Sequence, residues 1–468
     1  MFNRIINTSD DYKLKEIKVY GIKLSYLYNE VLTDSESINE IILKHLVKLN
    51  KRQLKSLNNY IPSCGCKIIK KDGIIDCLND GYLIIYYKKL YAFLVKSKLD
   101  RGVPTLNSEL SIGGSKDSFS ENINTNIGLI RKRIKNNLIN KSFNIGRISD
   151  TKVNLLYIEN VCRKSLVDNV ISKINNIDID GIVDTSYLKQ VFENNKIFPT
   201  VMITERPDNT MMALLEGKIV LLVDNSPYAL ILPCFFFDFF HTTDDYYQKN
   251  FNTSFIRVIR LIAFIIAIFI PGIYISVTTR NYDLVPSSLL LMLKAGRSFV
   301  PFPAYIEALF MIICFEILRE SDLRMSTTSG TAVSILGGLI LGDAAVAAGI
   351  VSPIMIIVIA ISSIAGLIFS SLELVNALRY YKILILILST FLGIIGVIFG
   401  LVILISDILS TKTFNYRYFY IDKSDINDLI IKKDEDIKLR KNVLTNNTIR
   451  GRFKWKRYLF LLLLFYLY

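Results

Sequence analysis

The sequence predicts an α/β N-terminal region, in two lobes on the cytosolic side, followed by an α-helical polytopic membrane domain. The first observation is composition: 51% of the 468 residues are apolar, which excludes a disordered chain and is high for one soluble globule. The second is charge, because residues 257–406 hold only 16 of the 98 charged side chains. Runs this long and this apolar are typical of bilayer-spanning helices. The third is an alternation of strand-like and helix-like segments before residue 250.

The first lobe is predicted over 1–107. Residues 1–16 mix charges with small apolar side chains and lack the apolar core of a secretory signal, so we expect the N-terminal region to stay in the cytosol. Apolar residues at helical spacing predict a helix over 35–60, with Ser35 as its N-cap. Runs rich in β-branched and aromatic residues predict strands within 66–77, 82–87 and 90–97.

The second lobe is predicted over 108–250. Its apolar strand-like runs alternate with helical stretches, which is typical of layered α/β structure. The predicted helices are 121–139, 161–175 and 185–193. The first of them carries a basic cluster that is either a solvated helix face or a patch for lipid head groups or a partner: Arg131, Lys132, Arg133 and Lys135.

The membrane domain is predicted over 251–406, with a shorter, interfacial segment at 284–297. Its five apolar segments are 257–277, 299–318, 331–350, 352–373 and 381–406. Two glycine pairs have the small-xxx-small spacing that lets helices approach closely in lipid: Gly338 with Gly342, and Gly396 with Gly400.

The basic tail, 407–468, sets the predicted topology. Its stretch from 407 to 457 holds thirteen Lys or Arg residues, and the positive-inside rule places such a segment in the cytosol. Because the N-terminal lobes are also expected there, the number of crossings must be even. We therefore expect the Gly/Ala-rich segment 331–350 to enter the membrane without crossing it, as a re-entrant element.

Three acidic residues in the apolar segments are candidates for an ion path, because a carboxylate in a bilayer is costly unless it is paired or hydrated. Glu307, expected near the middle of its helix, is either a cation site or a hydrogen-bonded group that locks the bundle. Glu316 is expected to form a hydrated pair near the helix end. Asp343 either faces an ion path or caps a half-helix, and the two roles are compatible.

No enzyme site emerges from the sequence. It has no phosphate-binding loop, zinc-protease motif or nucleophile elbow, and only two histidines. The segment Glu205-Arg206-Pro207-Asp208 follows a predicted strand and is interpreted as an ion pair with Pro207 fixing the turn, the alternative being a catalytic loop. Six scattered cysteines predict reduced thiols, with no metal and no cofactor. The net charge of +14 points to anionic lipid and not to nucleic acid, since no nucleic-acid motif accompanies it.

Several stretches between 108 and 406 resemble, in the right order, the A subunits of the GerA family of bacterial spore germinant receptors. Residues 1–107 match only weakly, and the tail after about 410 lacks the family's usual Pro-rich ending. The matching stretches are SELSIGGSKDSFSENINTN (108–126), TERPD (204–208), LLEGKIVLLVDNSPYALILP (214–233, with Glu216), DDYY (244–247), RLIAFIIAIFIPGIYISVTT (260–279), PFPAYIEALFMIICFEILRE (301–320) and GDAAVAAGIVSPIMIIVIA (342–360).

The resemblance implies a subunit of the spore inner membrane that works with receptor B and C subunits. Nutrients trigger such a complex, and monovalent cations then leave the spore core. The A subunits are implied to be its homo-oligomeric, ion-conducting part.

Three functions follow from the sequence. The first is a gated channel subunit. The second is a secondary transporter subunit, since broken helices and membrane-embedded acids occur in both classes; four or five segments without an internal repeat favour the channel, whose pore then needs several copies. The third is a non-conducting membrane scaffold that positions the cytosolic region for receptor partners.

Overall fold

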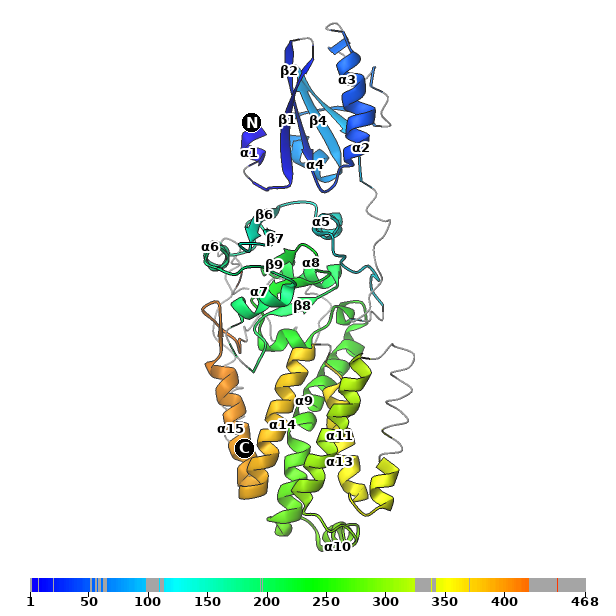
Figure 1. The fold of residues 1–468 in the computed structure, drawn as a ribbon, viewed down its shortest axis with the longest axis vertical. Coiled ribbons are helices and arrows are strands. Elements are labelled where there is room, and N and C mark those ends of the chain that lie inside the picture. The colour runs from blue at the N-terminus through cyan, green and yellow to red at the C-terminus, as the bar shows by residue number, and fades with distance from the viewer. Residues whose placement is uncertain are drawn as a thin grey trace.

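Figure 1 shows the computed structural model, an elongated molecule in which the first lobe, the second lobe and a helical bundle follow one another along the long axis. The structure describes residues 2–6, 8–19, 21–50, 53–54, 57, 60–61, 65–97, 109, 113–193, 195, 197–324, 338, 342–369, 371–420 and 444.

The first lobe is one five-stranded sheet with helices on both faces. The strand order is β1-β2-β4-β5-β3 and all pairs are antiparallel. Leu46 packs with Leu24, Leu83 and Phe93 on one face, and Leu78 with Ile84 on the other. The strands are β1 (Tyr12–Val19), β2 (Ile22–Asn29), β3 (Lys67–Ile69), β4 (Tyr82–Tyr87) and β5 (Lys89–Leu94), and the helices are α1 (Phe2–Ile6), α2 (Ser35–Ser37), η1 (Ile38–Leu43), α3 (Lys44–Lys48), η3 (Lys71–Gly73) and α4 (Ile74–Asn79).

Two expectations for this lobe were wrong in detail. The helix predicted to begin at a Ser35 cap is capped instead by Asp34, whose carboxylate accepts from the backbone N–H groups of Glu36 and Ser37, and the run of α2, η1 and α3 ends at Lys48. The strand predicted within 66–77 is β3 followed by α4, because β3 is only three residues long and the apolar residues after it line a helix face.

The second lobe repeats the plan with the order β6-β7-β9-β10-β8, again all antiparallel. Strand–helix alternation usually indicates parallel pairing, but the described strands of this lobe pair only in antiparallel fashion. The elements are α5 (Ile123–Arg133), β6 (Leu138–Ile145), β7 (Thr151–Ile158), α6 (Lys164–Asn175), α7 (Thr185–Phe192), β8 (Met202–Thr204), α8 (Pro207–Leu215), β9 (Ile219–Val223), β10 (Ala229–Leu232), η4 (Phe236–Phe240) and η5 (Thr243–Tyr246).

The basic cluster on and just after α5 is solvated only in part, because Lys132 and Lys135 are exposed but Arg131 is buried. Arg131 is 1% exposed and forms an ion pair with Asp11 of the first lobe, while its Nη2 donates to Ser9 Oγ at 3.0 Å. Lys135 reaches Asp80 of the same lobe at 2.8 Å. Two of the four cations therefore join the lobes, and Arg131 is the buried one.

The helices after residue 250 form a bundle around α9 (Figure 1). Of the described helices, α9 and α14 are long and apolar enough to cross a bilayer, while α13 and α15 are apolar but shorter. The helices are α9 (Asn250–Thr279), η6 (Tyr282–Leu284), α10 (Ser287–Ala295), α11 (Ala304–Arg324), α13 (Pro353–Gly366), α14 (Leu372–Leu392) and α15 (Ile394–Ser410).

The apolar segment predicted as 381–406 is two helices. Gly393 has a φ of +64°, a left-handed conformation that glycine adopts readily and that ends a helix. The chain reverses there, so α14 and α15 form a hairpin. After α15, the strands β11 (Lys412–Thr413) and β12 (Tyr416–Arg417) return to the second lobe. The predicted boundary at 406 is therefore four residues early, and the start of the tail is packed structure.

Candidate functional site: the charged joint between lobe and helices

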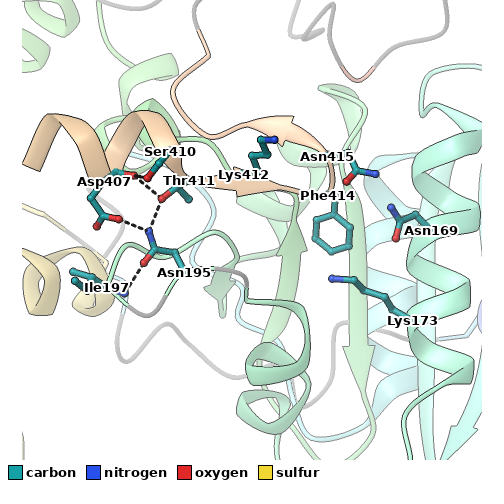
Figure 2. A pocket seen from close by; sticks show the side chains of 10 residues that line it. All are labelled: Asn169, Lys173, Asn195, Ile197, Asp407, Ser410, Thr411, Lys412, Phe414 and Asn415. Atoms are coloured by element: carbon teal, nitrogen blue, oxygen red, sulfur yellow. Dashed lines mark hydrogen bonds between the residues drawn. The ribbon is translucent and has the colours of Figure 1, made fainter.

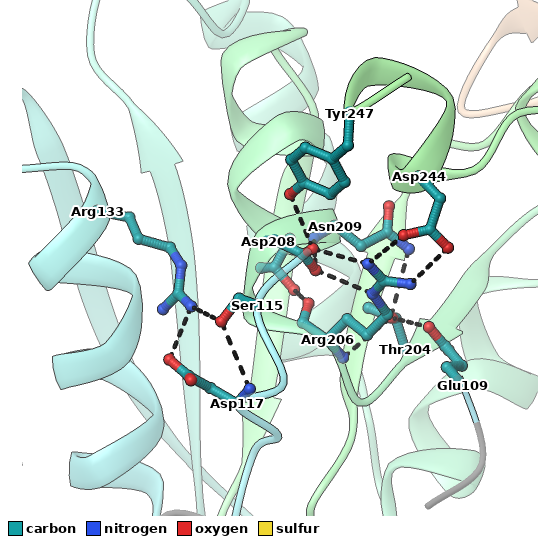
Figure 3. Close-up of polar contacts among 11 residues, drawn as sticks. Glu109, Ser115, Asp117, Arg133, Thr204, Arg206, Asp208, Asn209, Asp244 and Tyr247 are labelled. Carbon is teal, nitrogen blue, oxygen red and sulfur yellow. Dashed lines mark hydrogen bonds and ion pairs between the residues drawn. The ribbon is translucent and has the colours of Figure 1, made fainter. Parts of the chain in front are cut away.

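The predicted ion pair after β8 exists and extends further than the sequence indicated. Arg206 donates to both carboxylate oxygens of Asp208, at 3.0 and 2.8 Å, and to Asp244 at 3.2 and 3.4 Å. Tyr247 donates to Asp208 at 3.0 Å. Figure 3 shows this cluster, in which the TERPD and DDYY stretches meet although they are separated by some 40 residues of chain.

Local structure explains the arrangement. Pro207 occupies the first position of α8, where the missing N–H is not needed and the fixed φ suits a helix. Asp208 then lies in the first turn, where the helix dipole favours a negative charge. Burial opposes ionisation of Asp208, but the hydrogen bonds and charge of Arg206 outweigh it and lower the pKa of the carboxyl. The cluster is a structural contact in which Arg206 pairs with two carboxylates, in agreement with the ion-pair interpretation.

Glu205 holds the segment that enters the second lobe. Its Oε1 accepts from the backbone N–H of Glu109 at 2.7 Å, and its own carbonyl accepts from Phe119 N–H at 2.9 Å. Thr204 donates to Glu109 Oε2 at 2.8 Å. Burial raises the pKa of Glu109 to about 7, so this carboxyl titrates near neutral pH beside the motif.

Glu216 belongs to a second buried group. Lys218 Nζ lies 2.7 Å from Glu216 and 2.8 Å from Asp238. Burial opposes the charge of this ammonium, but Asp238 and Glu216 outweigh it and raise its pKa well above the ordinary value. Asp238 also accepts from Phe235 N–H at 2.9 Å, so the group fixes the turn at η4 that leads toward the helices.

Asp245 joins this lobe to the start of α9. It is 3% exposed and accepts from Arg260 at 2.7 and 2.9 Å and from Arg257 Nε at 3.4 Å. Thr253 donates to the carbonyl of Asp245 at 2.8 Å. Burial opposes ionisation of Asp245, but the hydrogen bonds and charge of Arg260 outweigh it and lower the pKa of the carboxyl.

Two further contacts join the lobe to α14 and α15, and sequence analysis missed both. Lys189 of α7 lies 2.5 Å from Glu373 at the start of α14. Asp407 near the end of α15 accepts from Tyr381 at 2.5 Å and from Asn195 of the second lobe at 3.4 Å. The only signal in the sequence is position, because Glu373 and Asp407 each stand at the end of an apolar run.

The acidic candidates Glu307 and Glu316 are both paired. Glu307 is 1% exposed and accepts from Arg297 Nη2 at 2.9 Å and from the N–H of Ser352 at 3.0 Å. It lies in the first turn of α11 and not mid-helix, because the helix begins only after Pro303. Glu316 pairs with Arg379 of α14 at 2.9 Å, a partly exposed contact between two helices, where a pair near the end of its own helix was expected.

Asp343 differs from the other two acids. It lies in a helical stretch over 342–347, its side chain is exposed, and within the described part of the chain no ion pair or hydrogen bond of its carboxylate is present. Half of the segment expected to be re-entrant, 331–350, lies outside the described residues. Asp343 is therefore the one of the three acids that is exposed and has no partner among the described residues.

The two glycine pairs have different surroundings. A Cβ on Gly396 would lie 2.1 Å from Leu388 O, and one on Gly400 would lie 2.4 Å from Ile385 Cγ1, so these glycines allow α15 to pack on α14. A Cβ on Gly338 or Gly342 would meet none of the described residues within 4 Å. The pair on α15 serves packing inside the chain, whereas the other pair has no such neighbour among the described residues.

Comparisons with known proteins identify the family. The family described as "Bacillus/Clostridium GerA spore germination protein" matches residues 1–443, which extends the resemblance beyond the expected 108–406. Spore germination protein KA of Bacillus subtilis (strain 168) is 33% identical over 428 residues, 88% of this chain and 79% of that protein. Spore germination protein GerQA of Bacillus cereus is 32% identical over 462 residues, 96% of this chain and 93% of that protein.

The N-terminal domain of the A subunit of the Bacillus megaterium spore germinant receptor GerK3 is 26% identical, with 50% of this chain and 92% of that chain covered and a TM-score of 0.39. Spore germination protein A1 of Bacillus subtilis (strain 168) is 30% identical over 426 residues, 89% of this chain and 88% of that protein. The predicted resemblance is confirmed: the chain belongs to the GerA family of spore germination proteins.

Proposed function

We propose that this chain is the A-type membrane subunit of a nutrient-responsive germinant receptor in the spore inner membrane, and that several copies form its ion-conducting part. Receptor B and C subunits are its expected partners, and monovalent cations leaving the core are its expected cargo. Family membership supports the role in germination. The observation that carries the conduction proposal is the exposed carboxylate of Asp343 beside an open glycine face.

Insertion into a bilayer is supported by helix length and surface. At about 1.5 Å per residue, α9 is about 45 Å long and α14 about 32 Å, against about 30 Å for the hydrocarbon core. The outward faces of the helices expose large apolar side chains that have no role in the bundle core: Ile262, Ile265, Ile357, Phe391, Ile398 and Val402.

We further propose that the lobes and the returning tail lie on the core side of the membrane. The end of α15 and the start of α14 both contact the second lobe. The starts of α11 and α13 lie together at the opposite end, because Ser352 N–H donates to Glu307. The helices α11 and α13 therefore run in the same direction, toward the second lobe.

Cysteine labelling tests this orientation. In a cysteine-free background in right-side-out vesicles, a membrane-impermeant maleimide should label Asp283→Cys at the far end of α9. It should reach Lys116→Cys in the second lobe and Lys412→Cys after α15 only in inverted vesicles. Labelling of Lys412→Cys in right-side-out vesicles would contradict the proposal that the lobes and the tail lie on the same side of the membrane.

A water path inside one copy has little support. The centre of the bundle is filled by side chains of α9 packed against α14, and a Cβ on Gly272 would lie only 2.6 Å from Ile385 Cγ2. Glu307 and Glu316 are neutralised by arginines. A path between copies would instead be lined by Asp343, whose carboxylates would form a ring that concentrates cations.

Gly342→Leu should break up the oligomer, because a leucine would push the neighbouring copy away from a glycine whose Cβ position meets none of the described residues. Overpacking costs roughly 1–3 kcal/mol per site, so the subunit dissociation constant should rise about tenfold or more. Native mass measurement of the detergent-purified full chain reports subunit number directly.

Ala347→Leu is the matched control, since Ala347 is exposed in the same helical stretch but points to another side. It should leave the oligomer intact. A wild-type monomer with its own binding cavity would contradict the channel proposal and favour a transporter.

A further inference from the structure

The helical bundle contains a buried lysine whose ammonium has no hydrogen bond or ion pair among the described residues. Lys382 of α14 is 6% exposed, and the charges that act on its ammonium are those of Glu316, Arg379 and Arg319. Two of these three groups are cations themselves. Burying an ammonium group is costly unless an anion compensates its charge, so the surroundings of Lys382 favour an anion.

The carboxylates nearby do not supply that compensation. Glu316 forms its ion pair with Arg379, at 2.9 Å. Glu320, the next acid on α11, pairs with an arginine one turn later on its own helix. Asp322 is exposed, where solvent screens its charge. The buried lysine and Arg319 therefore remain as two cations without an ion pair in the described part of the chain.

The level of these two cations in the bundle indicates where an anion comes from. The outward face of α11 is apolar as far as Ile317, which is 60% exposed, and becomes charged at the exposed Glu320. On α14 the exposed ring of Tyr380 lies two residues before Lys382, and aromatic side chains gather at the membrane–water interface. In a membrane-inserted protein the two cations therefore lie at the depth of the lipid head groups.

The end of α15 lies at the same level. Tyr381, which precedes Lys382, donates to Asp407 near the end of that helix. Figure 2 shows Asp407 at a cavity of about 830 Å³ that is lined mainly by polar side chains, where Asn195 of the second lobe contacts it. The apolar surface of the bundle thus gives way to polar surface on α15 as it does on α11.

We propose that Arg319 and Lys382 form a binding site for the phosphate of an anionic phospholipid. Arg319 is half-buried and contacts the phosphate, because a guanidinium can donate to two phosphate oxygens at once. Lys382 attracts the phosphate from beneath, while Arg379 stays paired with Glu316. The proposal rests on the membrane insertion proposed above, and it needs neither an oligomer nor ion conduction. Soluble phosphate esters share this chemistry, so the experiment separates the two sources.

The full chain is purified in detergent and mixed with phosphatidylglycerol or phosphatidylcholine, and the bound lipid is counted by native mass spectrometry. We expect the wild type to retain phosphatidylglycerol in preference to phosphatidylcholine. Arg319→Gln combined with Lys382→Met should lower the retention of phosphatidylglycerol roughly tenfold or more, because each cation beside an anionic lipid adds to its binding. Arg319→Lys keeps the charge and should retain the lipid.

Thermal unfolding gives a second measurement that does not count lipid. Phosphatidylglycerol should raise the unfolding temperature of the wild type, since a ligand stabilises the folded state that binds it, and should leave that of the double variant unchanged. Without lipid, Lys382→Met alone should be at least as stable as the wild type, because it removes a buried charge that has no counter-ion. A less stable Lys382→Met would contradict the uncompensated charge.

Lys294→Gln is the matched control, because Lys294 is a lone exposed lysine on α10 at the other end of the bundle, where it would also meet head groups (Figure 1). It should change lipid retention little. Retention unchanged in the double variant would overturn the site. Displacement of the lipid by equimolar glycerol phosphate would overturn the lipid as the source. The assay measures neither subunit number nor ion flux, so its failure is distinct from failure of the channel proposal.

Discussion

Asp343→Asn should lower cation release from germinating spores by on the order of tenfold, the smaller end of the range by which a charged cleft concentrates its ions. The substitution keeps the shape of the side chain but removes one negative charge per copy from the proposed ring. Protein level and subunit number should not change, because the exposed carboxylate makes no ion pair or hydrogen bond within the described part of the chain. Potassium efflux from spores that carry this receptor alone is the measurement.

Asp283→Asn is the matched control, because Asp283 is another exposed aspartate at the same end of the bundle. It should leave efflux unchanged. If Asp343 instead caps a half-helix, Asn serves about as well as Asp. Normal efflux in Asp343→Asn together with loss of protein in Asp343→Leu would therefore remove Asp343 from the ion path.

Asp245→Asn should destabilise the folded chain by about 3–5 kcal/mol, the usual cost of breaking a buried ion pair. The loss is large because Asp245 is buried and pairs with both Arg257 and Arg260 where the lobe meets α9. Thermal unfolding of the detergent-purified protein, followed by circular dichroism, measures the effect. Asp168→Asn, at an exposed position on α6, should change stability little.

Lowering the pH should reduce the difference in stability between the wild type and Asp245→Asn. The folded pKa of Asp245 is lowered, so its contribution is complete above the ordinary aspartate pKa of about 3.9 and is lost as the pH falls through the lowered value. The stability gap between wild type and Asp245→Asn should therefore close progressively below about pH 4. A gap that stays constant would mean that the amide disturbs packing and that charge is not the cause.

Local patterns predicted the elements well where they are strongly apolar. The strands β4 and β5 and the helices α6 and α7 lie where hydrophobic patterning placed them. The β1–β2 hairpin was missed because charged residues alternate with apolar ones along β1 and break up its apolar run. The break at Gly393 was missed because the residues on both sides are equally apolar, and only the reversal of the chain distinguishes two helices from one.

The ion pairs show a different limit of what can be predicted from the sequence. The pair of Arg206 with Asp208 was predictable because the partners are two residues apart. Lys189 and Glu373, or Arg131 and Asp11, are more than a hundred residues apart, and no periodicity indicates which opposite charges meet. Arg131 therefore had the same pattern as its solvated neighbours, although it is the buried contact between lobes.

The second lobe is fastened to three helix ends, through Asp245 at α9, Lys189 at α14 and Asn195 at α15. A lobe attached to the bundle at one point could rotate about that point, and a lobe attached at two points could rotate about the line between them. Three separate attachments prevent both rotations. Any torque on the lobe is thus delivered to all three helices together. A stimulus that rotates the second lobe must therefore displace the attached ends of α9, α14 and α15 together.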